Sequence, residues 1–112
     1  MKLNKTGKAA IAEYVATTLF VYTGCGSVYS SGGDKLTIAL AFGLSITSLA
    51  YTVGHVSGGH MNPIVTIAML ILGQLDILSG VCYIVAQLLG ATTAAGFLSV
   101  GMKSHSVSSF VN

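Results

Sequence analysis

The chain has 112 residues, of which 53% are hydrophobic and only 7% are charged, whereas soluble domains carry about 25% charged residues. This composition is typical of a membrane protein, and the length allows one domain at most. The net charge of +2 comes from scattered lysines without any arginine, and this pattern argues against a nucleic-acid partner.

Residues 1–8 are polar and carry three lysines, and residues 9–29 form an apolar run long enough to cross a bilayer once. We predict an N-terminal tail followed by a first transmembrane helix. A secretory signal is the alternative, because the sequence that ends at Cys25 resembles a lipoprotein cleavage site. Glu13 inside the apolar run and Tyr22 three residues before the cysteine argue against that alternative.

Two further apolar segments have the length of membrane spans. Residues 30–35, SSGGDK, have the composition of a turn. Residues 36–53 and 77–100 contain no charged residue, and we predict the second and third transmembrane helices there. Small residues one helical turn apart favour close helix packing in lipid. Such pairs are Ala39/Gly43 in the first of these segments, and Gly90/Ala94, Ala91/Ala95 and Thr92/Gly96 in the second.

Residues 54–72, GHVSGGHMNPIVTIAMLIL, lie between these two spans and contain the only proline of the chain. Asn62 at the N-cap and Pro63 at the first helical position are a strong signal for the start of a helix. A helix from Pro63 to Leu72 rises by about 15 Å, half of a hydrocarbon core of about 30 Å. We therefore predict a re-entrant loop and a half-helix that begins inside the bilayer, followed by a break at residues 73–76.

The lysines also predict an orientation. Three spans place the two termini on opposite sides of the membrane. Three lysines precede the first span, against Lys35 and Lys103 on the other side, so the positive-inside preference is small but favours a cytoplasmic N-terminus. The half-helix loop then enters from the cytoplasm, and residues 101–112 form a polar, serine-rich tail.

The start of the half-helix carries the first candidate site residues. If the Asn62 side chain caps the N–H of Val65, its amide N–H groups need another acceptor, for which water in a lumen is suited. A plain N-cap without a ligand is the alternative. The positive end of the helix dipole opposes cations at that depth. Gly58 and Gly59 allow an extended backbone whose carbonyl groups face a pore.

Glu13 and Gln87 are polar residues inside predicted spans. A carboxyl group in the membrane is a functional-site hypothesis by default, but we favour a structural role for both, as partners of the loop. His60 lies beside the cap, and its spacing from His55 fits no usual metal pair, which favours a packed neutral histidine.

No catalytic or metal-binding pattern can be argued from this sequence. Cys25 and Cys82 lie in apolar runs without a C-x-x-C spacing, which favours free buried thiols. No nucleophile, base and orienting group can be placed together, so we expect neither an enzyme nor a cofactor.

Taken together, these residues resemble the aquaporins, or major intrinsic proteins, over residues 9–100. The segments that carry the resemblance are AEYVATTLF in the first helix, ALAFGLSITSLA in the second, SGGHMNPIVT in the loop and YIVAQLLGA in the third. That family has six spanning helices and two half-helices in inverted repeats, which meet at the midplane around a narrow water or glycerol pore. The resemblance implies an all-α membrane protein with three transmembrane helices and one re-entrant half-helix, half of the family's right-handed helical bundle.

The resemblance also implies roles for the residues of the loop. Asn62 and Pro63 resemble the family's first pore motif, in which the asparagine donates hydrogen bonds to single-file water. Gly58, Gly59 and His60 resemble the segment whose carbonyl groups line the pore.

Three residues outside that motif, and the third residue of the motif itself, complete the comparison with the family. Phe42 falls at a position of the outer constriction, where an aromatic residue is typical of water-selective members. Glu13 and Gln87 resemble the buried polar pair that holds the re-entrant loops. Ile64 departs from the family, which has alanine there, and this changes the packing between the half-helices.

The second half of the family fold, with a second Asn-Pro and an arginine, does not occur in this sequence. We therefore expect a fragment or a split subunit of a multi-pass plasma-membrane water channel, which pairs with a second half. The family's usual assembly is a homo-oligomer, typically a tetramer. The alternatives are a channel for glycerol or another small neutral solute, and a non-conducting partner of full-length aquaporins.

Overall fold

The computed structural model describes the backbone of residues 3–111 and the side chains of residues 3–105. Within this range the chain forms four helices and no strand: α1 (Lys5–Ser30), α2 (Lys35–Ser57), α3 (Pro63–Ile71) and α4 (Ile77–Val111). The prediction of an all-α fold is confirmed for the described residues.

Short polar side chains cap the N-terminal ends of three helices. The Asn4 Oδ1 accepts the N–H of Gly7 at 2.7 Å at the start of α1. Asp34 accepts the N–H of Thr37 at 2.8 Å before α2, and Asp76 accepts the N–H of Ser79 at 2.9 Å before α4. Each cap pairs a backbone donor that the first turn of a helix leaves without a partner.

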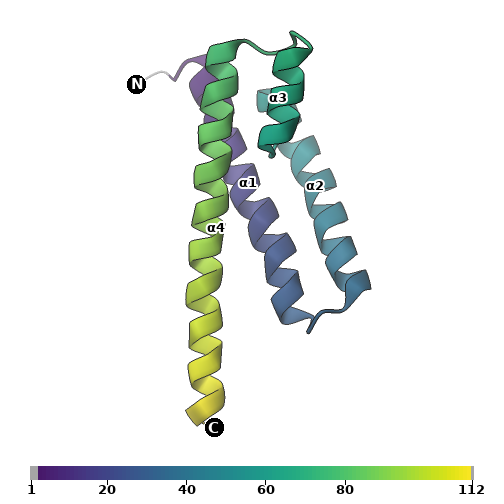
Figure 1. Cartoon of the computed structure of the whole chain (residues 1–112), viewed down its shortest axis with the longest axis vertical. Helices are drawn as coiled ribbons and strands as arrows, with labels where there is room; N and C mark the ends of the chain where they lie inside the picture. The colour runs from purple at the N-terminus through teal and green to yellow at the C-terminus, as the bar shows by residue number, and fades with distance from the viewer. Residues whose placement is uncertain (1–2, 112) are drawn as a thin grey trace.

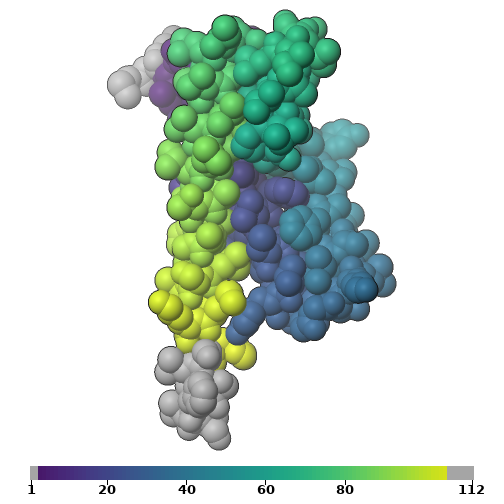
Figure 2. All heavy atoms as spheres, viewed as in Figure 1, coloured from purple at the N-terminus to yellow at the C-terminus, as the bar shows by residue number. Residues whose placement is uncertain are grey.

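α1 and α4 run in one direction along the bundle, and α2 and α3 run in the other. α1 packs against both α2 and α4, and α3 packs against α4. Figure 1 shows the N-terminus and the α3–α4 connection at one end, and the α1–α2 turn and the C-terminus at the other. α3 occupies only the first part of the bundle, and its first residue lies part-way along it. In the space-filling view α3 lies beside the upper part of α4 (Figure 2).

Three helices extend beyond the predicted segments. α1 begins at Lys5 rather than Ala9, and α4 continues to Val111 rather than ending at Val100. α2 continues to Ser57, beyond Val53, so the segment between α2 and α3 is shorter than predicted. In an apolar environment a helix is favoured over an open loop, because a helix pairs its own backbone groups. This gain outweighs the cost of a glycine inside the helix. Asn112 of the predicted tail lies outside the described residues.

Among the described residues, two helical segments are long and apolar enough to cross a membrane: α2, and residues 77–105 of α4. α1 has 26 residues but is less apolar, because Glu13 and Thr17 lie in its buried face. α3 has only nine residues.

Small residues allow close contact in the centre of the bundle. A Cβ at Gly90 would lie 2.7 Å from the backbone oxygen of Tyr14, and Ala94 one turn later is fully buried. The predicted close packing of this pair is confirmed. The pair Ala39/Gly43 differs, because Ala39 is exposed and a Cβ added at Gly43 would meet no other element of the described chain within 4 Å.

Candidate functional site

The segment between α2 and α3 has a backbone that ordinary residues rarely adopt. Gly58 ends α2 in the left-handed conformation with φ 92°, and Gly59 follows with φ 66°. Met61 has φ 51°, the only positive value outside glycine among the described residues. A Cβ at Gly59 would also lie 3.2 Å from the Cα of Ala50. The loop therefore requires glycine where it passes close to α2, and it holds Met61 in a strained conformation.

Glu13 of α1 holds this loop in place. Its Oε1 accepts the Ser57 hydroxyl at 2.6 Å and the N–H of His60 at 2.8 Å. Its Oε2 accepts the N–H of Met61 at 2.6 Å and the Gln87 amide at 2.9 Å. Glu13 is fully buried. Four donors therefore compensate the removal of the carboxyl group from solvent, and two of them come from the strained backbone.

Thr66 joins Gln87 and His60 to the start of α3. Its Oγ1 lies 2.9 Å from the Gln87 Nε2, which donates to it, and 3.0 Å from the His60 Nδ1. The side chains of Thr66 and Gln87 are almost completely buried. The Gln87 Oε1 is buried without a partner in the described part of the chain.

Tyr83 connects the loop to α4. Its hydroxyl donates to the backbone oxygen of Ser57 at 2.7 Å, and its ring packs edge-on against the His60 ring, with centroids 5.2 Å apart. Tyr83 is four residues before Gln87, so both side chains lie on the same face of α4. That face therefore contacts the loop directly through Tyr83, and through Gln87 it contacts Glu13 and Thr66, which hold the loop.

Asn62 is the N-cap of α3, and Pro63 is its first residue, as predicted. The Asn62 Oδ1 accepts the N–H of Ile64 at 2.9 Å. The predicted partner Val65 is wrong by one residue, because the cap bonds to the second rather than the third helical position, and N-cap side chains use either. The side chain of Asn62 is exposed. Its amide N–H groups have no acceptor in the described part of the chain.

The carbonyl groups of the loop are also without partners. Asn62 O accepts the N–H of Thr66 at 3.2 Å. The four carbonyls before it, from Gly58 to Met61, accept no hydrogen bond from any residue between 3 and 111. Buried backbone groups are nearly always paired, and unpaired ones at membrane depth occur only where they face a wet cavity or another chain.

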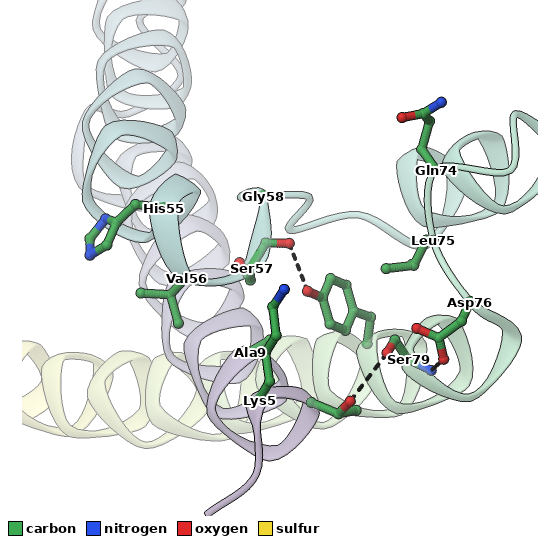
Figure 3. Close-up of a pocket in the computed structure, with 12 residues that line it drawn as sticks. Lys5, Ala9, His55, Val56, Ser57, Gly58, Gln74, Leu75, Asp76 and Ser79 are labelled. Atoms are coloured by element: carbon green, nitrogen blue, oxygen red, sulfur yellow. Dashed lines mark hydrogen bonds between the residues drawn. The ribbon is translucent and has the colours of Figure 1, made fainter.

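A cavity of about 400 Å³ lies beside the loop, between the start of α1, the end of α2 and the start of α4. Figure 3 shows that Ser57 and Gly58 form part of its wall and that Lys5, His55 and Asp76 stand around it. The Asp76 carboxyl is exposed, and hydrogen bonds from the Ser79 side chain and backbone hold its pKa below the usual value of 3.8. The cavity has a polar, charged rim at the same end of the bundle as the N-terminus.

The structure brings together most of the residues singled out in the sequence. Glu13, Gln87 and His60 lie in one buried cluster beside Gly58 and Gly59, and Asn62 and Pro63 follow directly at the start of α3. Phe42 lies apart from that cluster. Its half-buried ring contacts Phe20 edge-on with centroids 5.6 Å apart, and it packs against Gly24 of α1.

Sequence reasoning missed three members of the cluster, Ser57, Thr66 and Tyr83. A signal was available for two of them, because Thr66 follows Asn62 by four residues and Tyr83 precedes Gln87 by four. Residues at this spacing share a helix face. Cys25 was expected to be buried, but it is exposed.

The site offers hydrogen-bonding groups rather than reactive ones. Within residues 3–105, no three His, Cys, Asp or Glu side chains lie close enough to hold a metal ion. The groups left to a ligand are neutral, a row of carbonyl acceptors and one amide donor, and such a set suits a small uncharged molecule with both donors and acceptors.

A family model described as major intrinsic protein matches residues 1–112. Among curated relatives, Aquaporin-1 of Homo sapiens is 44% identical over 102 residues, Aquaporin-4 of Mus musculus 46% over 98 residues, and Aquaporin-5 of Ovis aries 48% over 94 residues. These alignments cover 81–82% of this chain but only 30–38% of each relative. The chain thus spans about a third of the length of the relatives it matches.

Proposed function

Because the chain belongs to the major intrinsic protein family, we propose that it forms one half of a water-conducting pore across a membrane. In this proposal α1, α2 and α4 are transmembrane helices, α3 is a re-entrant half-helix, and the carbonyl groups from Gly58 to Met61 line the path. Asn62 donates to water where the path is narrowest.

The row of unpartnered carbonyls is the observation that supports this proposal best. Each carbonyl left without a hydrogen bond in an apolar medium costs several kcal/mol, of the order of 4 or more. The Glu13 carboxyl fixes the N–H groups of His60 and Met61 inward, so the carbonyls of the same peptide segment are left for other partners. Water arriving in single file supplies donors to the carbonyls and an acceptor for Asn62.

The charge of the site favours neutral solutes. The N-terminal end of α3 carries a partial charge of about +0.5, which opposes cations and protons. Phe42 favours water over glycerol, because its bulky ring is held by contacts with Phe20 and Gly24 and would restrict the width of the path. The cavity bordered by Lys5 and Asp76 gives water access to Gly58 from the N-terminal end.

We also propose an orientation for the chain and the partners that surround it. The N-terminus lies in the cytoplasm, and the membrane is the plasma membrane. A second half-pore faces Asn62 and completes the path, and lipid covers the rest of the apolar surface. The chain works without a cofactor.

Osmotic swelling of vesicles that contain the chain together with the second half of a longer relative, such as Aquaporin-1 of Homo sapiens, tests this function. We expect water permeability above that of vesicles without the protein, with glycerol entry unchanged. Asn62→Ser keeps an oxygen for the helix cap but removes the amide donors, and it should lower the permeability several-fold. Leu44→Ala, on the exposed face of α2, is the control and should conduct like the original chain. Swelling no faster than in empty vesicles would refute the proposal.

A further inference from the structure

The cavity beside the loop contains a hydroxyl group to which the proposed pore assigns no role. Thr6 lies in the first turn of α1, and its half-buried side chain is part of the cavity wall. Its Oγ1 lies 3.3 Å from the Ser79 Oγ of α4, the one hydrogen bond of this side chain within the described residues. Bonds between two hydroxyl groups usually measure about 2.5–3.0 Å, so the contact holds Thr6 only weakly.

Positive charge surrounds this hydroxyl group. The sequence KTGK at residues 5–8 places a lysine on each side of Thr6. Figure 3 shows that the Lys5 side chain extends into the cavity, whose wall also contains Thr6 and Ser79. An anionic group attached to Thr6 would therefore find an ammonium group and a hydroxyl group as donors on the same wall.

Asp76 is the one acidic residue of the cavity wall. Its carboxyl group is exposed and accepts the backbone N–H of Ser79 at 2.9 Å. This carboxylate opposes a second negative charge, but solvent and salt screen an exposed group. Lys5 and Lys8 together outweigh it.

The first turn of α1 can open for an enzyme. Asn4 holds this turn through the N–H of Gly7, which its side chain accepts at 2.7 Å, and the N–H of Lys8, which its backbone oxygen accepts at 3.1 Å. The ends of helices open at little cost in free energy. Thr6 can therefore reach an active site that binds an extended peptide.

We propose that Thr6 is a phosphorylation site and that its phosphate closes the cavity. The inference rests on the proposed function, in which the cavity gives water access to Gly58 and the N-terminus lies in the cytoplasm. A kinase transfers the terminal phosphoryl group of ATP to the Thr6 Oγ1. The new bond joins this oxygen to phosphorus, the bond between the last two phosphates of ATP breaks, the hydroxyl proton passes to the kinase, and ADP leaves.

The phosphate changes both the charge and the free space of the cavity. It carries about −1.5 to −2 charges at pH 7 and three acceptor oxygens. Charge-assisted hydrogen bonds from the Lys5 ammonium and the Ser79 hydroxyl hold it between α1 and α4. Part of the volume of about 400 Å³ is then filled, and Gly58 loses its route to water.

Phosphorylation is tested on the full chain in detergent micelles, with ATP and a serine/threonine kinase that prefers basic sequences. We expect mass spectrometry to find a phosphate on Thr6. Thr6→Val keeps the shape of the side chain without the hydroxyl group and should abolish this modification. A chain that stays unmodified, or is modified only at other residues, would overturn the inference.

Thiol labelling measures whether the cavity closes. In a chain with Cys25→Ser and Cys82→Ser, Val56→Cys places a thiol on the cavity wall, where Val56 is 37% exposed. An uncharged, water-soluble thiol reagent should react with it several-fold more slowly when Thr6→Glu is added, and at an unchanged rate with the neutral control Thr6→Gln. Leu72→Cys, at a position that is 67% exposed and lies outside the cavity wall, should react equally in both backgrounds. Equal rates at Val56→Cys in both backgrounds would contradict the closure.

A second substitution tests the role of Lys5. In the chain with Thr6→Glu, Lys5→Gln should restore fast labelling of Val56→Cys, because the negative group then loses its ammonium partner. Lys35→Gln removes a lysine at the opposite end of the bundle and should leave the labelling slow. Restoration by Lys35→Gln, or a lack of restoration by Lys5→Gln, would refute the proposed contact.

Water permeability separates this inference from the proposed function. In vesicles that also contain the second half of a longer relative, Thr6→Glu should lower permeability several-fold relative to Thr6→Gln. Slow labelling of Val56→Cys with Thr6→Glu, in vesicles that no variant makes permeable to water, would support the closure and refute the pore. Fast swelling that Thr6→Glu leaves unchanged would support the pore and refute the closure.

Discussion

The cluster around Glu13 and the outer face of α2 have opposite chemistry. The largest fully buried side chains are Gln87, Glu13 and Thr66, all of them polar, whereas α2 leaves Leu36 69% and Leu44 63% exposed. Lipid solvates such an apolar face, while every buried polar group must find its partner inside the protein. This difference indicates that paired polar groups and close helix contact, rather than hydrophobic burial, hold these helices together.

The largest effect should follow from removing the centre of the polar cluster. Glu13→Leu leaves the buried N–H groups of His60 and Met61 without an acceptor and removes one acceptor from each of two side-chain donors, and we expect a loss of about 3–5 kcal/mol of stability. Unfolding in detergent micelles measures this. Leu44→Ala on the apolar face should change stability by less than about 0.5 kcal/mol. Equal losses in the two variants would contradict the distinction between the regions.

The next effect concerns close contact between α1 and α4. Gly90→Ala places a methyl group 2.7 Å from the Tyr14 backbone oxygen, so a helix must shift, at a cost of about 2–3 kcal/mol. Gly96→Ala is the matched control on the same helix, because no atom of the described chain lies within 4 Å of the added carbon. The same unfolding measurement should show no loss for the control, and equal behaviour of both variants would refute the packing.

A smaller effect should come from Thr66→Val, which keeps the shape of the side chain. The change removes one of the two acceptors of the Gln87 amide and the partner of the His60 ring, for an expected loss of about 1–2 kcal/mol. Thr92→Val, an exposed threonine that bonds only to its own helix at Leu88, should remain neutral in the same assay. A neutral Thr66→Val would show that this residue does not join the cluster.

The smallest effect should be the loss of stability at low pH that comes from two carboxyl groups outside the predicted spans. Hydrogen bonds from the Thr37 side chain and backbone, and from those of Ser79, hold the pKa values of Asp34 and Asp76 below 3.8. A lowered pKa in the folded state stabilises the fold above pH 3.8, and this contribution is lost as the pH falls through the folded-state pKa. Helix content from neutral pH to about pH 3 should fall slightly, and less in the variant with Asp34→Asn and Asp76→Asn. Identical acid profiles would exclude this contribution.

The start of α3 could be predicted because its signal is local. Asn62 and Pro63 determine cap and first turn regardless of what surrounds them. Glu13 and Gln87 stood out as polar residues in apolar runs. The strained Met61 and the extension of α2 to Ser57 had no such signal, since both depend on Glu13, which is far away in the sequence.

The four hydrogen bonds of Glu13 have a consequence for biosynthesis. The ribosome makes Glu13 long before its partners, 44 residues before Ser57 and 74 before Gln87. A carboxyl group at the centre of a lone helix opposes insertion by about 2.5–3.5 kcal/mol. If α1 spans the membrane as proposed, this cost disfavours its insertion as an independent helix, and the emergence of Gln87 on α4 completes the set of donors that removes the cost.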